Sequence, residues 1–260
     1  CLSLTLTACA EEPSSGQSPD VQRLENAAPQ RVLFIGNSYL YYNDSLHNHV
    51  ERIAEEIGPH GAGDYEFKSA TIGGARLSHH PVGKLLEPGR LGIEQAFELV
   101  ILQGGSMEPL TPENRAAFRE RAIELGEKIR ATGAEVALYM THAYVEPDAR
   151  YEPDLIDKIA PTYVSVGNEL GALVIPVGLA FELAYEHGRQ TTEICNAAAA
   201  ARAQGGDLSS AAEWIRRSLD LDTGLVEVEY QTYPYRAVFT PFRRQYLAHL
   251  TEDLILARFS

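Results

Sequence analysis

Cysteine and positive charge are both scarce in this chain of 260 residues. It has 3 cysteines, no Cys-x-x-Cys pair and no His-x-x-x-His spacing, so nothing in the sequence supports a zinc site or another metal centre. Lysine and arginine number 22 against 36 aspartate and glutamate residues, which gives a formal net charge of -14. Because this charge repels polyanions, nucleic acid and anionic membrane surfaces are excluded as expected partners.

Long apolar runs are also missing. Beyond the N-terminus, no segment reaches the ~18 consecutive apolar residues that a transmembrane helix needs. Hydrophobic residues nevertheless make up 45% of the chain, which is enough for one sizeable core. We therefore expect a single globular domain.

The N-terminus carries a signal for lipid attachment. Residues 1–9 end an apolar stretch with Leu6-Thr7-Ala8-Cys9, which resembles the bacterial lipobox, where the signal is cut before the cysteine. The resemblance implies that residues 1–8 are a truncated signal peptide, that Cys9 is acylated and that 9–30 form a flexible, Pro/Ser-rich tether. The lipid bilayer is then a partner, and the protein faces the periplasm or the exterior of a bacterial cell envelope. The alternative is a buried N-terminal strand.

Strand and helix patterns alternate along the rest of the chain. This alternation predicts a three-layer α/β/α fold with a central parallel sheet of about five strands, similar to flavodoxin. The sequence changes in character after residue 186, where we expect a capped helix at 207–219, an alternating, tyrosine-rich run at 225–235 and a final helix at about 243–257. Strands are expected at 32–35, 65–72, 99–102, 136–140 and 173–177, and helices at 44–57, 111–131 and 154–171.

The first strand runs directly into Gly36-Asn37-Ser38. Ligands of parallel α/β sheets bind outside the carboxyl ends of the strands, and a serine at such a turn lies beside free backbone N–H groups. Those N–H groups can stabilise a developing oxyanion. The alternative is an ordinary loop in which Asp44 or Ser45 caps the following helix.

Four segments at predicted strand ends resemble, in order and spacing, the SGNH (GDSL-like) hydrolases. The closest likeness is to the bacterial branch whose first block contains Ile-Gly-Asn-Ser. The resemblance covers 31–186 of a domain that we expect to span 31–260, and 187–260 diverge from the family. The segments are Phe34–Tyr39, Thr71–His80, Val100–Ser106 and Tyr139–Tyr144.

This resemblance implies roles for individual residues. Ser38 would be the nucleophile that forms an acyl-enzyme, and the N–H groups of Ser38 and Gly74 would be oxyanion donors. The family's third block normally supplies an asparagine amide, and Gln103 would take its place here. For Gln103 a structural role in the loop is the open alternative. A serine hydrolase of this kind requires no metal or organic cofactor.

The general base is absent from its usual place. The family carries Asp-x-x-His before the last helix, and the C-terminal part of this chain has no such block. Three explanations stay open: a degenerate catalytic site, divergence of 187–260, or a shift of reading frame near residue 187. His142 and His80 are candidate substrate contacts, and His249 lies beyond the position expected for the base.

Three functions remain possible on this sequence. The leading one is a serine esterase that removes small acyl groups, acetyl among them, from a carbohydrate or another small-molecule ester. The alternative is a degenerate lipoprotein of the same fold that binds such a ligand without turnover. A third, weaker hypothesis is phosphate binding at Gly36 in a flavodoxin-like or Rossmann-type domain, although the Gly-x-Gly-x-x-Gly spacing is missing.

Overall fold

The computed structural model describes residues 18–42, 44–145 and 148–185. The chain divides into two compact units, residues 1–182 and 183–260, and only 183–185 of the second unit are described. The expectations for Cys9, His249 and the divergent segment 187–260 therefore lie outside the described residues. Among the helices that are described, none is long and apolar enough to cross a membrane.

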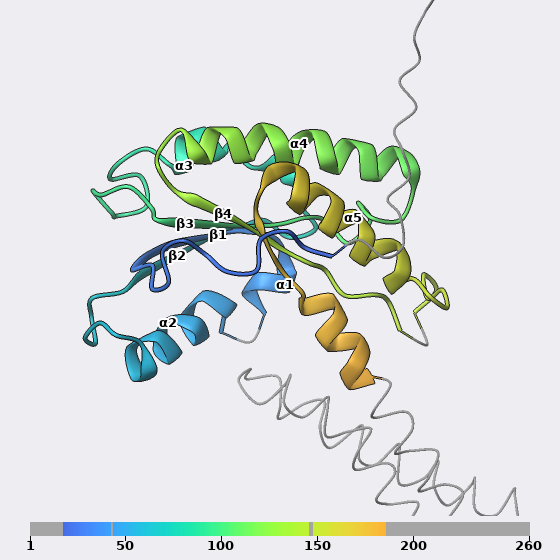
Figure 1. The fold of residues 1–260 in the computed structure, drawn as a ribbon, viewed down its shortest axis with the longest axis horizontal. Helices are drawn as coiled ribbons and strands as arrows, with labels where there is room; N and C mark the ends of the chain where they lie inside the picture. The colour runs from blue at the N-terminus through green and yellow to red at the C-terminus, as the bar shows by residue number, and fades with distance from the viewer. Residues whose placement is uncertain (1–17, 43, 146–147, 186–260) are drawn as a thin grey trace, which may run out of the picture. The chain divides into compact units, whose positions relative to one another are not determined.

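The core of the first unit is a parallel five-stranded sheet in the order β2-β1-β3-β4-β5 (Figure 1). The expected α/β fold with a central parallel sheet is confirmed. β1, β3, β4 and β5 are short and largely apolar, as is typical of strands that are covered on both faces, whereas the edge strand β2 is mostly polar and only partly buried. The strands are β1 (Arg31–Gly36), β2 (Glu66–Thr71), β3 (Leu99–Gln103), β4 (Glu135–Tyr139) and β5 (Leu173–Ile175).

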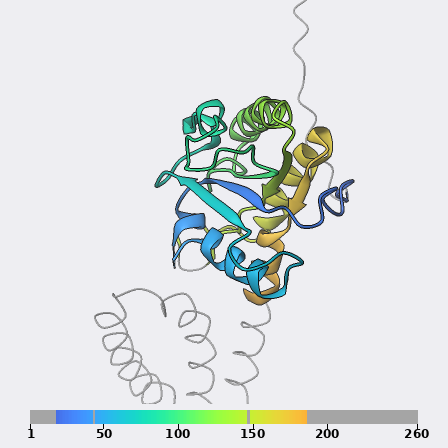
Figure 2. The same ribbon diagram turned by 90° about the vertical axis from the view of Figure 1, so that its left-hand side faces the viewer.

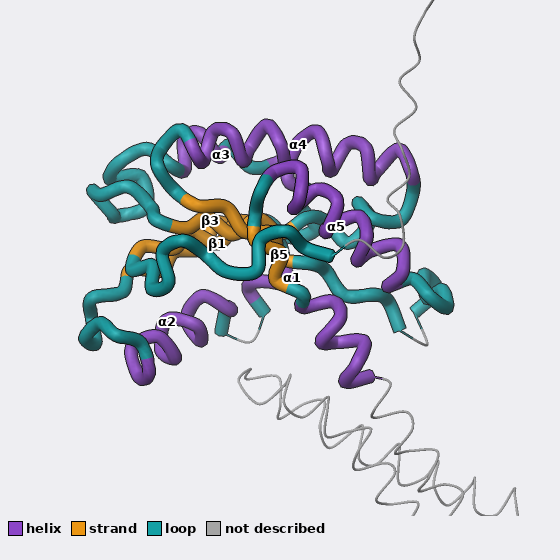
Figure 3. Tube along the Cα trace, viewed as in Figure 1, coloured by secondary structure: helices purple, strands orange, loops and turns teal. Residues whose placement is uncertain are grey.

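Helices cover both faces of this sheet (Figures 1 and 2). The short elements η1 (Leu77–His79) and α3 (Val82–Leu85) lie on the same side as the long helices α4 (Pro112–Arg130) and α5 (Ile156–Leu170). The other face carries α1 (Ser38–Tyr41), α2 (Leu46–Ile57) and a helical segment at 177–185 (Figure 3). The three expected layers are therefore present.

The alternation of side chains along β1 divides the core between these layers. Leu33 and Ile35 belong to the cluster that contains Phe118 of α4, whereas Val32 and Phe34 belong to the cluster on the opposite face. Successive side chains of a strand point to opposite faces, so one strand supplies both clusters. This packing on both faces holds the carboxyl end of β1 in place between β2 and β3.

The helix expected at 44–57 is α2, which begins at Leu46, and the short α1 before it was not expected. Asp44 and Ser45 have φ of 67° and 59°, so neither residue is helical and α2 starts after them. Ser45 is the N-cap of α2, but its side chain makes no capping hydrogen bond. By contrast, Thr111 caps α4 as expected, since its side chain accepts a hydrogen bond from Asn114 N.

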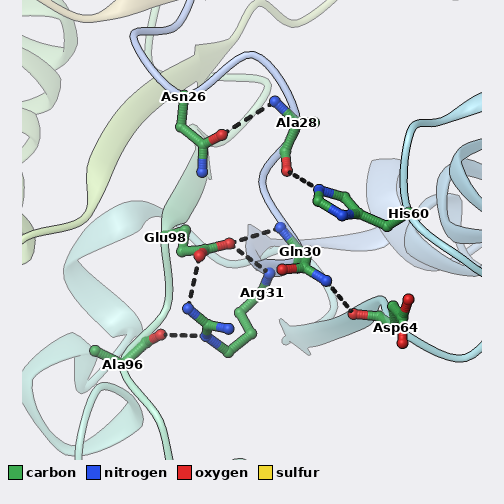
Figure 4. A network of polar contacts seen from close by, with 8 residues as sticks. All are labelled: Asn26, Ala28, Gln30, Arg31, His60, Asp64, Ala96 and Glu98. Atoms are coloured by element: carbon green, nitrogen blue, oxygen red, sulfur yellow. Dashed lines mark hydrogen bonds and ion pairs between the residues drawn. The ribbon is translucent and has the colours of Figure 1, made fainter.

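Gln30 and Arg31, at the start of β1, are held against the amino edge of the sheet by Glu98 (Figure 4). The Glu98 carboxylate, just before β3, accepts hydrogen bonds from the backbone N of Gln30 at 2.6 Å and of Arg31 at 3.2 Å. The same carboxylate pairs with the Arg31 guanidinium at 2.6 Å. One acidic side chain thus fixes the start of β1 against the start of β3.

The chain before Gln30 is held in the same way. The Glu135 carboxylate at the start of β4 accepts from the backbone N of Glu25 and of Asn26, both at 2.8 Å. Asn168 Oδ1 on α5 accepts from Asp20 N, also at 2.8 Å. The second half of the expected tether therefore makes specific contacts with the domain, on the edge opposite the candidate site.

Candidate active site

Three residues that the sequence singles out lie at the carboxyl edge of the sheet. Ser38 is the first residue of α1 and follows β1, Gly74 follows β2, and Gln103 is the last residue of β3. Because β2, β1 and β3 are neighbours and parallel, their carboxyl ends meet at one edge. The structure therefore brings these three residues to the same side, where open α/β sheets bind their ligands.

Asn37 joins the three loops that carry these residues. Its backbone N donates to Gln103 Oε1 at 2.9 Å. Its side-chain Nδ2 donates to Ala75 O at 3.0 Å and to Gly104 O at 3.4 Å, and its Oδ1 accepts from Tyr39 N as the N-cap of α1. Asn37 is only 4% exposed. It is a positioning residue for Ser38, and the preference of asparagine for N-caps was the available sequence signal.

The Gln103 side chain is fully buried, and its amide is engaged within this turn. Oε1 accepts from Asn37 N, and Nε2 donates to Gly104 O. These bonds support the turn that carries Ser38, as the structural alternative for Gln103 requires. A direct contribution of its amide to an oxyanion stays a prediction.

Two backbone N–H groups at the edge have no hydrogen-bond partner among the described residues. They belong to Ser38, at the start of α1, and to Gly74. Gly74 lies in a turn closed by a hydrogen bond from Ala75 N to Ile72 O at 3.1 Å, and its φ of 68° is one that favours glycine. Both N–H groups are thus available to an external acceptor.

His142, after β4, lies next to the start of α1. Its ring centroid is 4.6 Å from that of Tyr39 and 4.9 Å from that of Phe181 in the helical segment 177–185. Its Nδ1 is 2.9 Å from Ala143 O. With Nδ1 donating its proton to this carbonyl, Nε2 carries a lone pair that can accept a proton. Within the described part of the chain, however, Ser38 Oγ makes no hydrogen bond to a histidine.

The His80 side chain is buried instead of exposed at the carboxyl edge of the sheet. It is 2% exposed and lies near the backbone of Gly36, and its Nε2 has no partner among the described residues. Burial lowers its pKa, so the ring is neutral at ordinary pH. Its neighbour His79 is exposed and accepts a hydrogen bond from Arg76 N at 3.2 Å.

Hydroxyl groups gather beside His142. Tyr144 OH donates to Ser106 Oγ at 2.6 Å, and Arg150 Nη1 donates to Tyr144 OH at 2.8 Å. The Tyr39 phenol lies near Ser106 and Tyr144, and burial raises its pKa to about 12, so it stays protonated. We call Tyr39, Ser106, Tyr144 and Arg150 the hydroxyl cluster. Sequence reasoning assigned no role to the last three.

The part of the chain that the structure describes contains no group of three or more His, Cys, Asp or Glu side chains arranged to hold a metal ion. The chemistry at this edge therefore has to be derived from a serine hydroxyl, backbone N–H groups, imidazoles and phenols.

Comparisons with known proteins complete this description. No family model matches the chain. No curated protein matches it either. Among solved structures, a candidate SGNH hydrolase from Slackia heliotrinireducens is similar with a TM-score of 0.47 and 24% identity, covering 59% of this chain and 82% of that one. An acetyl xylan esterase, AlAXEase, has a TM-score of 0.41 and 14% identity, covering 55% and 75%. The SGNH-hydrolase family esterase AlinE4 has a TM-score of 0.43 and 17% identity, covering 56% and 76%.

Proposed function

We propose that the protein is a serine esterase of the SGNH type that removes small acyl groups through an acyl-enzyme on Ser38. The observation that carries this proposal is the pair of unpartnered N–H groups, of Ser38 and Gly74, at the edge where Ser38 begins α1. A carbonyl oxygen that becomes an oxyanion needs such donors. The four sequence blocks that resemble this family support the same assignment.

The reaction follows from these groups. Ser38 Oγ attacks the ester carbonyl, its proton passes to a base, and the tetrahedral oxyanion accepts hydrogen bonds from the N–H groups of Ser38 and Gly74. Collapse expels the alcohol and leaves the acyl group on Oγ. Water then attacks this ester, releases the acid and restores the serine.

The base determines how fast this reaction runs. Among the described residues His142 is the histidine placed beside α1, with Nε2 able to accept a proton, but no histidine hydrogen-bonds to Ser38 Oγ. A serine hydroxyl without an engaged base is a weak nucleophile, and oxyanion stabilisation alone leaves a residual rate. We therefore expect turnover that is slow compared with that of serine esterases carrying a complete triad.

The hydroxyl cluster supports a polar alcohol as the leaving group. Tyr39, Ser106 and Tyr144 present phenol and hydroxyl groups, and Arg150 adds guanidinium donors. Such groups can exchange their mutual hydrogen bonds for bonds to the hydroxyls of a sugar. An acylated carbohydrate is accordingly the proposed substrate class.

The competing proposal is ligand binding without turnover. It is favoured by the same observation that limits the rate, namely the lack of a hydrogen bond between Ser38 Oγ and a base in the described residues. Under this proposal the edge binds an acylated sugar but does not cleave it.

Hydrolysis of p-nitrophenyl esters of increasing acyl length separates these proposals. We expect slow but measurable, saturable hydrolysis of p-nitrophenyl acetate by the wild-type protein, and a lower rate for p-nitrophenyl octanoate. A rate equal to that of the buffer, together with calorimetric binding of an acetylated xylose oligomer, would favour the binding protein instead.

We propose in addition that Cys9 is acylated and anchors the protein to a bacterial membrane with its domain in the periplasm or outside. The support is the lipobox-like segment Leu6–Cys9, which lies outside the described residues. Membrane fractionation of cells that express the wild-type chain and Cys9→Ser tests it. The wild-type protein should sediment with membranes and the variant should not, whereas an unmodified, fully released wild-type protein would contradict the anchor.

A further inference from the structure

Glu108 is a buried carboxyl group that the proposed reaction does not use. It is 3% exposed and lies in the loop that follows β3. Its Oε2 accepts a hydrogen bond from the backbone N of Gly105, in the same loop. The backbone N–H of Leu77, in the loop that follows β2, lies close enough to lower the pKa of the same carboxyl group. One side chain therefore joins two loops of the candidate site.

These two loops approach each other closely. A Cβ atom on Gly105 would stand 3.3 Å from Ala75 O and 3.2 Å from Arg76 Cγ. On the same pair of loops, Asn37 Nδ2 donates to both Ala75 O and Gly104 O. Asn37 and Glu108 thus hold this pair of loops at neighbouring points. Ala75 directly follows Gly74, so contacts that hold residues 75–77 also restrict the movement of Gly74 and of its N–H group.

The surroundings of Glu108 act on its charge in both directions. Burial raises the pKa of this carboxyl group above its ordinary value, and the hydrogen bond from Gly105, the charge of Arg76 and the nearby N–H of Leu77 offset this rise only in part. Arg76 is itself held by Asn114 of α4, whose Oδ1 accepts from its guanidinium at 3.0 Å. In either protonation state an oxygen of this carboxyl group can accept a hydrogen bond from the Gly105 N–H, and the ionised form accepts it more strongly.

We propose that Glu108 is a positioning residue that aims the Gly74 N–H at the oxyanion by holding the loops after β2 and β3 together. The inference rests on the proposed esterase function. It assigns Glu108 no contact with the substrate. Its contribution is to keep a donor within the narrow geometry that transition-state stabilisation requires.

The test compares Glu108→Leu, Glu108→Gln and a control, Val136→Ala. Val136 is a buried β4 residue whose truncation lowers stability without touching either loop. We measure kcat and KM for p-nitrophenyl acetate at a temperature where all three variants are folded, and amide hydrogen exchange of the peptide that contains residues 72–79. Glu108→Leu should lower kcat by about 10- to 100-fold with little change in KM, because the donor acts mainly on the transition state.

The remaining outcomes are specific. Glu108→Gln keeps a carbonyl oxygen as an acceptor and should retain most of the wild-type kcat. If protonation of Glu108 lowers the wild-type rate at acid pH, this decrease should be absent from Glu108→Gln. Amide hydrogen exchange of the peptide that contains residues 72–79 should be faster in Glu108→Leu than in the wild type, and unchanged in Val136→Ala. A folded Glu108→Leu with the kcat of Val136→Ala would overturn the inference while leaving the esterase proposal intact. A wild-type protein without Ser38-dependent hydrolysis would overturn both.

Discussion

Replacing Ser38 with alanine is expected to lower the hydrolysis of p-nitrophenyl acetate by about 10²-fold or more. The variant keeps the N–H groups of residues 38 and 74, so binding and oxyanion stabilisation survive, but no acyl-enzyme can form. The loss should be smaller than in enzymes with a complete triad, where a serine knockout costs about 10⁶-fold, because the wild-type serine has no engaged base among the described residues.

Ser45→Ala is the matched control for this change. Ser45 is a nearby serine at the start of α2, and its Oγ lies 3.4 Å from Tyr41 O without capping the helix. Its removal should leave the rate within about twofold, since surface substitutions of this kind usually have small effects. Steady-state kinetics on the two purified variants makes the comparison. Equal activity of Ser38→Ala and the wild type would remove the hydrolase proposal.

Gly36→Ala is expected to destabilise the turn that carries Ser38. A Cβ at this position would stand 2.4 Å from Gln103 Oε1 and 2.8 Å from Leu40 Cδ1, both in the buried turn. The Gln103 side chain would have to move, and Asn37 N would lose its acceptor. An unsatisfied buried N–H and an overpacked core each cost about 1–3 kcal/mol. We expect the free energy of unfolding to fall by about 2–4 kcal/mol, with loss of Ser38-dependent activity.

Gly83→Ala provides the control for Gly36→Ala. Gly83 lies in α3, and a Cβ there would meet nothing within 4 Å. Alanine is favoured over glycine inside a helix, so this variant should be as stable as the wild type or slightly more stable. Urea denaturation followed by circular dichroism measures both. Equal midpoints for Gly36→Ala and Gly83→Ala would show that the Gln103–Asn37 contact does not hold the turn.

The fold was predictable because its signal is local. Runs such as Leu99–Leu102 are apolar at every position, and the Thr111-Pro112 pair marks the start of a long helix with its cap. The start of α2 at Leu46 instead of residue 44 was not predictable, since it depends on positive φ angles at Asp44 and Ser45. Those conformations are set by the surrounding contacts more than by the residue type.

The supports of the candidate site depend on partners that are distant in sequence. The Gln103 amide accepts from Asn37, and Glu108 joins the loops after β2 and β3. The hydrophobic periodicity of the sequence cannot predict such contacts, because they form only when the parallel strands bring distant residues together. The same holds for Glu135, whose bonds to Glu25 and Asn26 place part of the expected tether on the domain. Motifs indicated where chemistry should occur, and the structure shows what holds the residues there.

Covalent labelling with a fluorophosphonate, read by intact-protein mass and peptide mapping, tests the central claim most directly. The probe phosphonylates a serine only where the hydroxyl is nucleophilic and an oxyanion site accepts the phosphonyl oxygen. The wild-type protein should gain one adduct, located on Ser38, and Ser38→Ala should gain none. A wild-type protein that stays unlabelled, or an adduct that persists in Ser38→Ala, would contradict the assignment of Ser38 as the nucleophile.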